Sequence, residues 1–328
     1  MTRRRYAVFG AGAIGALYGA RLAAAGHEVH FVLRSALDHV RAHGLRVESV
    51  YGDVFLARPS VHADPSTVPA VDVVLVGLKT THDAALAELL PALAGPGTVV
   101  VVLQNGLGVE ARAASLVPGA TVLGGLCFTC SNQVGPGHVR HLDYGAITLG
   151  EHRPDGDAAG LTPAVAAVTA DLEAAGVEMH PTDDLGAARW RKLVWNVPFN
   201  GLSVVLDAGT DELVGHPDTE ALVGVIMDEV IAAAAAVGHP IPASTRDELL
   251  DMTRRMRPYA TSMKLDADAG RPLEVEAIHA APAAAARHAG CPMPSVEVLR
   301  DQLRFLDARG QRVASRNQAD STARNATS

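Results

Sequence analysis

The sequence predicts an α/β fold, in which a parallel sheet is followed by an all-helical domain. Three observations support this prediction. Continuous apolar runs typical of buried strands alternate with helical patterns in the first half of the chain. A glycine-rich turn directly follows the first of these runs. Beyond Asp184 the strand signals stop, and apolar residues recur at helical spacing instead.

The expected elements follow the chain in this order. Strands are predicted at residues 6–9, 28–33, 71–76 and 98–103, and helices at 13–25, 81–93 and 161–175. Residues 121–149 contain strand-like pieces separated by Gly135-Pro136-Gly137, which predicts hairpins at the edge of the sheet. Helical spacing then continues through residues 187–206, 219–237, 244–266 and 273–307.

A chain of 328 residues is long enough for two domains. We expect an α/β domain over residues 1–183 and a helical domain over residues 184–308. The remaining residues, 309–328, are polar and lack apolar periodicity, so we expect them to be disordered.

Composition argues against several classes of function. A net charge of −8 disfavours binding to nucleic acid or anionic lipid, and 4% aromatic residues disfavour a stacking platform for single strands. No apolar run reaches the roughly 18 residues of a membrane span. Three cysteines cannot form a disulfide framework and suggest a reducing compartment. We therefore expect a cytoplasmic protein without nucleic-acid or membrane partners. A signal peptide is the alternative for the arginine-led first residues, although glycines interrupt the apolar stretch.

The turn Gly10-Ala11-Gly12-Ala13-Ile14-Gly15 follows a predicted strand and opens a predicted helix. In a dinucleotide-binding turn, the first glycine permits the tight turn and the second lets the backbone approach a pyrophosphate. The third allows close packing of helix and strand, while the helix N-terminus faces the anion. The motif predicts a Rossmann-type domain. The alternative is an ordinary tight turn between strand and helix.

Three further residues follow predicted strands at the end where such sheets bind ligands. The second strand is followed by Arg34, where an NAD enzyme would carry Asp or Glu; a guanidinium suits a 2′-phosphate and favours NADPH. Lys79 and Asn105 follow the next two strands. The alternatives are a solvated arginine at the first position and plain turn residues at the other two.

In the helical half, Lys192, Asn196 and Asn200 are spaced to form one stripe on an otherwise apolar helix. Buried polar groups need partners, so this stripe is a candidate for one side of a ligand-binding site. A kink in the helix is expected at Pro198. The alternative is a solvated helix edge. Ser262 and Glu274 flank a helix break, and Glu274 could simply complement a helix N-terminus.

Cys127 and Cys130, followed by His138 and His141, have the residue types of a zinc site. Cysteines three apart in a strand point to opposite faces, and the histidines are too closely spaced for a zinc finger. We therefore expect no metal site here and interpret the cysteines as small buried thiols.

Taken together and in order, these features resemble the ketopantoate reductases (2-dehydropantoate 2-reductases) over about residues 5 to 307. The glycine turn, Arg34, Leu78-Lys79-Thr80 and Gln104-Asn105-Gly106 match the cofactor half of that family. The stretch from Lys192 to Asn200 and the stretch from Thr261 to Glu274 look like its two later signatures.

The resemblance implies roles for these residues. Lys192 would be the general acid and Glu274 would bond the substrate hydroxyl. The nicotinamide would meet the substrate near Lys79 and Asn105, and three residues would hold the substrate: Asn196, Asn200 and Ser262. The sequence departs from the family at Tyr259, at Gly201-Leu202-Ser203 and at His279-Ala280, which leaves the choice of 2-oxo acid open.

The resemblance thus implies NADPH-dependent reduction of ketopantoate to pantoate in pantothenate biosynthesis, in a possible homodimer. One alternative is a related reductase of another small 2-oxo acid. The other is a nucleotide-binding sensor without turnover, although both Lys192 and Glu274 are present. Ala-rich stretches at 231–237 and 280–286 could pack against a partner chain or within the core.

Overall fold

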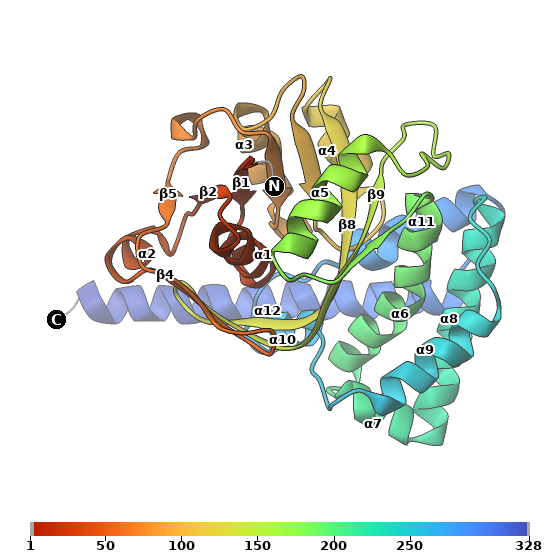
Figure 1. Ribbon diagram of the computed structural model, residues 1–328. Helices are drawn as coiled ribbons and strands as arrows, with labels where there is room; N and C mark the ends of the chain where they lie inside the picture. Colours follow the sequence, from red (N-terminus) through yellow and green to blue (C-terminus); the bar gives the residue numbers. More distant parts are fainter. Residues whose placement is uncertain (1–2, 327–328) are drawn as a thin grey trace. The chain divides into compact units, whose positions relative to one another are not determined.

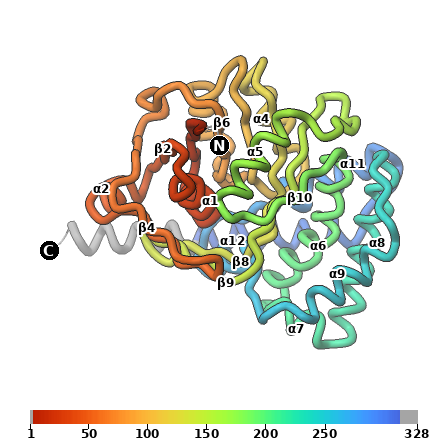
Figure 2. The backbone as a smooth tube through the Cα atoms, in the orientation of Figure 1, coloured from red at the N-terminus to blue at the C-terminus, as the bar shows by residue number. Residues whose placement is uncertain are grey.

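The computed structural model describes residues 3–326, with side chains described as far as residue 312. The chain divides into two compact units, Met1–Ala188 and Arg189–Ser328. This division falls a few residues beyond the predicted boundary at residue 183. Strands and helices alternate in the first unit, whereas the second consists of helices (Figures 1 and 2).

One sheet of ten strands organises the first unit. The strands are β1 (Arg5–Phe9), β2 (Glu28–Val32), β3 (Leu45–Ser49), β4 (Val54–Leu56), β5 (Ser60–His62), β6 (Val73–Val76), β7 (Val99–Val102), β8 (Thr121–Gly135), β9 (His138–Glu151) and β10 (Met179–Pro181). Their order across the sheet is β4-β3-β9-β8-β7-β6-β1-β2-β5, and β10 pairs with β9. The pairs β3–β4 and β8–β9 are antiparallel, and the remaining pairs are parallel.

The strand β1 lies at the point where the chain reverses its direction across the sheet. Phe9, its last residue, pairs with Val32 of β2 on one side and with Val76 of β6 on the other. Val76 in turn pairs with Val102, the last residue of β7. The carboxyl ends of these parallel strands therefore share one edge of the sheet. Ligands of open α/β sheets bind at such a reversal.

Helices of the first unit cover the sheet. They are α1 (Ala13–Ala24), α2 (Leu37–His43), α3 (Asp83–Leu89), α4 (Val109–Leu116) and α5 (Pro163–Ala174), with short 3₁₀ turns η1 (Pro65–Thr67), η2 (Thr80–His82) and η3 (Leu90–Ala92). Tyr6 and Val8 of β1 pack in one core cluster with residues of α1 and α5. The alternate residues Ala7 and Phe9 are buried as well, so both faces of this central strand are covered.

The predicted position of the hairpin at the sheet edge was wrong. β8 and β9 do form a long hairpin, but β3 and β10 pair with the far side of β9, which places the hairpin inside the sheet. The strands β3, β4 and β5 were not predicted, because none of them contains a continuous apolar run of four residues or more. The helix expected at 81–93 is also divided, since Pro91 ends α3 and forms part of η3.

The second unit is built from helices, as the loss of strand signals predicted. Its elements are α6 (Leu185–Val205), which begins just before the division, α7 (Thr210–Gly215), α8 (Pro217–Ala236), α9 (Ser244–Arg255), α10 (Ser262–Asp268), the π-helical turn η4 (Glu276–Ala280), α11 (Ala281–His288) and α12 (Pro294–Ala326). Pro258 lies in the break between α9 and α10. Gly290, with φ of +76°, separates α11 from α12. None of the described helices is long and apolar enough to cross a membrane.

The helix α12 continues through residues 309–326, where the sequence analysis expected disorder. No proline or glycine interrupts residues 311–326, and alanine, arginine and glutamine favour helix even without an apolar face. Residues 327–328, the end of the same predicted tail, lie outside the described residues.

Candidate active site

The glycine turn after β1 is as tight as its sequence predicts. Gly10 has φ of +90°, and a Cβ there would lie 2.7 Å from the backbone nitrogen of Leu78. A Cβ on Gly15 would lie 2.2 Å from the Gly10 carbonyl oxygen. At Gly12, by contrast, a Cβ would meet no atom within 4 Å. The turn therefore needs glycine for its own geometry at two positions and leaves open space at the third.

The N-terminus of α1 opens onto this space. Gly12 is the N-cap residue, no side chain caps the helix, and its first turn contains no acidic residue. Ala11, Ala13 and Ile14 are half-buried. The first N–H groups of a helix lack partners within the helix, and they carry its positive dipole end. This arrangement suits the pyrophosphate of a dinucleotide.

The other cofactor candidates lie beyond the strands beside β1. Arg34 is exposed, two residues past the end of β2. Lys79 and Asn105 are half-buried, follow β6 and β7, and each has an interaction partner in the structure. A Cβ on Gly77 would lie 2.6 Å from the Gly10 carbonyl oxygen, so the segment before Lys79 packs directly on the glycine turn.

In the second unit, α6 carries the predicted polar stripe. Asn196 and Asn200 are 5% and 2% exposed, and Lys192 is half-buried. Arg189 and Ser203, both buried, extend the stripe by one step at each end. Neither residue was predicted to belong to the site, although each is three residues from a predicted member of the stripe, Lys192 or Asn200.

The end of this stripe is joined to α10. Thr261 caps α10, with its Oγ1 accepting from the backbone nitrogen of Lys264 at 3.2 Å. The same Oγ1 lies 2.7 Å from Oγ of Ser203, within hydrogen-bonding distance. Ser262, half-buried, is the first residue of α10 and follows this contact directly. The bond therefore ties the start of α10 to the polar stripe of α6.

Glu274 is 6% exposed and lies between α10 and η4. Helical spacing from residue 273 onward predicts an α-helix at this point, but Glu274 precedes a π-helical turn instead. Its carbonyl oxygen accepts from the backbone nitrogen of Ile278 at 3.1 Å. On the other side, the backbone nitrogen of Leu273 donates to Oδ1 of Asp307 at 3.2 Å. One backbone–backbone bond and one bond to the Asp307 side chain thus hold the segment that carries the Glu274 carboxyl group.

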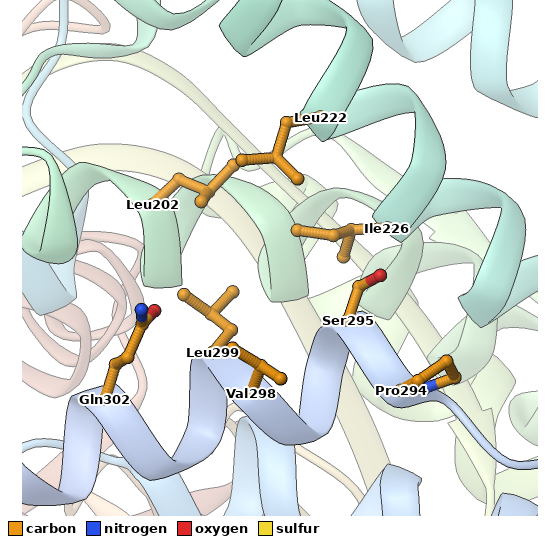
Figure 3. Close-up of a pocket in the computed structure, with 8 residues that line it drawn as sticks. All are labelled: Leu202, Leu222, Ile226, Pro294, Ser295, Val298, Leu299 and Gln302. Atoms are coloured by element: carbon orange, nitrogen blue, oxygen red, sulfur yellow. The ribbon is translucent and has the colours of Figure 1, made fainter.

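The structure therefore groups the candidate residues in two sets. The cofactor candidates belong to the first unit and the substrate candidates to the second; the latter are Lys192, Asn196, Asn200, Ser262 and Glu274. A separate pocket lies on α6, α8 and α12 and is mostly apolar (Figure 3). It contains none of the five substrate candidates.

The residues whose types resemble a zinc site are buried cysteines and a hydrogen-bonded histidine. Cys127 and Cys130 are buried in β8, and burial raises the pKa of the Cys130 thiol to about 12. A neutral thiol is a poor metal ligand. The ring of His141 has three contacts: Nδ1 lies 2.9 Å from Oγ of Ser49, and Nε2 lies 3.0 Å and 2.8 Å from the carbonyl oxygens of Asp143 and Tyr144.

A largely parallel sheet with an uncapped helix N-terminus at its glycine turn is typical of dinucleotide-binding proteins. The half-buried lysine and two buried amides on α6 suit a small polar substrate, so the two units together indicate the class of nucleotide-dependent oxidoreductases. Comparison with known families is consistent with that class. Residues 6–154 match the family model for ketopantoate reductase PanE/ApbA, and residues 184–307 match the model for its C-terminal part.

Individual relatives agree. A 2-dehydropantoate 2-reductase from Nostoc sp. is 47% identical over 311 residues, covering 95% of this chain and 98% of the relative. Another from Halobacterium salinarum is 32% identical, covering 93% and 100%. The crystal structure of 2-dehydropantoate 2-reductase from Geobacter metallireducens superposes with a TM-score of 0.87 at 41% identity, covering 92% and 99%. The chain therefore belongs to the ketopantoate reductase family and is an oxidoreductase.

Proposed function

We propose that this protein reduces 2-dehydropantoate (ketopantoate) to pantoate with NADPH, a step of pantothenate biosynthesis. The polar stripe on α6, in which Asn196 and Asn200 are buried and Lys192 is half-buried, carries the proposal, because it offers one cation and two amides to a small polar substrate. The similarity to the Nostoc reductase over nearly the whole chain supports the choice of substrate.

The first unit would hold the cofactor. The backbone of the Gly10–Gly15 turn and the start of α1 would bind the pyrophosphate, and the open space at Gly12 would admit it. Arg34 would pair with the 2′-phosphate. Lys79 and Asn105 would lie near the nicotinamide. NADPH, when bound, supplies the hydride that reduces the ketone carbon.

The second unit would supply the proton and hold the substrate. As negative charge develops on the ketone oxygen, Nζ of Lys192 would donate a proton to it as the general acid. The Glu274 carboxyl group would bond the substrate hydroxyl and orient it. Asn196, Asn200 and Ser262 would hold the remaining polar groups of the substrate.

The homodimer and the cytoplasmic location remain predictions. The two Ala-rich stretches do not support a dimer, because α8 and α11 pack on each other and bury Ala233, Ala234, Ala283 and Ala286. A partner chain would instead have to cover exposed apolar side chains such as Leu222 and Val298. Sedimentation at micromolar concentration should show a species of twice the chain mass, and a monomer alone would contradict the dimer.

A panel of small 2-oxo acids with NADPH tests the proposal, with the absorbance of the reduced nicotinamide as the readout. Ketopantoate should give the highest kcat/KM of the panel. A higher kcat/KM for another 2-oxo acid would identify that acid as the substrate and leave the proposed type of reaction unchanged. If no member of the panel were reduced, the proposal that this protein reduces a 2-oxo acid would be wrong.

A further inference from the structure

His279 is a buried imidazole that the proposed chemistry does not use. Its side chain is 0% exposed, and it lies in η4, the π-helical turn that follows Glu274. The backbone nitrogen of Ile278, the residue before His279, donates to the Glu274 carbonyl oxygen at 3.1 Å, so His279 directly follows the hydrogen-bonded turn that begins at Glu274. A shift of His279 would therefore move the backbone that carries the Glu274 carboxyl group.

The imidazole reaches from this turn to α6. Its Nε2 lies 2.9 Å from the carbonyl oxygen of Val197, and a carbonyl can only accept, so Nε2 carries the hydrogen and donates. Val197 stands between the two amides of the stripe, Asn196 and Asn200. It also precedes Pro198, which has no N–H to bond within the helix. The bond thus attaches η4 to the turn of α6 where the helix lacks one of its own bonds.

The shape of α6 permits this close approach. A Cβ on Gly201 would lie 2.8 Å from Nε2 of His279 and 2.5 Å from Cδ2 of Leu299 on α12. Any larger residue at position 201 would push the imidazole away from Val197. The absence of a side chain at Gly201 therefore allows η4, α6 and α12 to meet at His279.

The imidazole stays uncharged in this position. Burial lowers the pKa of His279 to about 4, with the hydrogen bond to Val197 opposing part of that shift. Nδ1 is buried without a hydrogen-bond partner among the described residues. The Nε2–H donor is therefore the polar contact that fixes this ring, and neither protonation nor a second bond competes with it near neutral pH.

We propose that His279 is a positioning residue. Its bond to the Val197 carbonyl oxygen fixes the position of the Glu274 carboxyl group relative to the amides of Asn196 and Asn200. The inference rests on the proposed reduction of a 2-oxo acid. The imidazole touches neither substrate nor cofactor in this role; it fixes the spacing between the carboxyl group on one element and the amides on another.

The test compares two substitutions of nearly equal length. His279→Gln keeps an amide N–H within reach of Val197, whereas His279→Met fills similar space without a donor. Thr253→Val is the matched control, because it removes another buried hydrogen bond of α6, from Nε1 of Trp195 to Oγ1 of Thr253 at 3.0 Å. Steady-state kinetics with ketopantoate, NADPH titration and thermal unfolding are measured for each protein.

His279→Met should lower kcat/KM for ketopantoate by about 10-fold to 100-fold, since a displacement of about 1 Å has effects of that size. Its affinity for NADPH should not change, and His279→Gln should recover most of the loss. Thr253→Val should lose thermal stability comparably but keep its kcat/KM. If His279→Met folds poorly, Gly201→Ala breaks the same contact by displacing the ring and should give the same kinetic loss.

Equal kcat/KM for His279→Met and Thr253→Val, measured below both unfolding transitions, would overturn the inference. So would a failure of His279→Gln to exceed His279→Met. A wild-type protein that reduced no 2-oxo acid would instead refute the proposed function. Failure of the positioning role and failure of the proposed function can therefore be distinguished.

Discussion

Arg34 lies exposed beyond β2, at the sheet edge where the glycine turn opens. A charge-assisted pair between its guanidinium and a 2′-phosphate contributes about 1.5–3 kcal/mol, or roughly tenfold to a hundredfold in affinity. Arg34→Ala should therefore weaken NADPH binding by that factor and leave NADH binding nearly unchanged. Titration of both cofactors by nicotinamide fluorescence measures the difference. Equal losses for the two cofactors would show that Arg34 does not bind the 2′-phosphate.

His279 also makes folding stability depend on pH. Its pKa of about 4 in the folded chain lies below the ordinary 6.5. Between these values the unfolded chain binds a proton and the folded chain does not, so stability falls as the pH drops from 6.5 towards 4. The slope from this group is at most about 1.4 kcal/mol per pH unit. Urea unfolding across this range should show a shallower decline for His279→Gln; identical slopes would be incompatible with a buried neutral imidazole.

At the scale of single residues, the sequence could predict those whose positions follow from a strand end or a helical period. Arg34, Lys79 and Asn105 follow strands, and Asn196 and Asn200 follow the period of α6. The role of His279 could not be predicted, because its bond joins segments 82 positions apart in the chain and depends on the missing side chain of Gly201.

Among the elements, the glycine turn gives the sharpest contrast. A methyl group at Gly12 meets no protein atom, so Gly12→Ala should fold normally. It would crowd a bound pyrophosphate at a cost of about 1–3 kcal/mol, which weakens NADPH binding by about fivefold to 150-fold. Gly10→Ala, with φ of +90° and a contact of 2.7 Å to Leu78, should lower the melting temperature instead. Wild-type NADPH affinity in Gly12→Ala would place the pyrophosphate elsewhere.

Elements were predictable where a long period or a continuous apolar run marked them, as for β1, β6, β7 and α6. The strands β3, β4 and β5 lack such a mark, and their positions depend on pairing rather than on local pattern: β3 pairs with β9, β4 with β3, and β5 with β2. The hairpin of β8 and β9 could be predicted from its turn residues. Its position inside the sheet could not be predicted, because it depends on the pairing of β3 and β10 with β9.

At the scale of the whole molecule, the proposed reaction assigns the hydride to the first unit and the proton to the second. The two contributions can be separated by substitution, because Lys192 lies on α6 and the glycine turn lies in the first unit. The fold class, a largely parallel sheet followed by helices, could be predicted from the sequence. The helical character of residues 309–326 could not, since no apolar stripe marks it.

The most direct test of the account is the turnover of Lys192→Ala with ketopantoate and NADPH, measured alongside NADPH binding. Arg191→Ala is the control, since it removes the neighbouring cation, which pairs with Glu248 at 2.9 Å. The account predicts that Lys192→Ala loses about 10²-fold or more in kcat while its NADPH affinity stays that of the wild type, because general acid catalysis contributes about 10²–10⁴-fold. Arg191→Ala should keep the kcat and the NADPH affinity of the wild type. Near-wild-type kcat in Lys192→Ala would contradict the account.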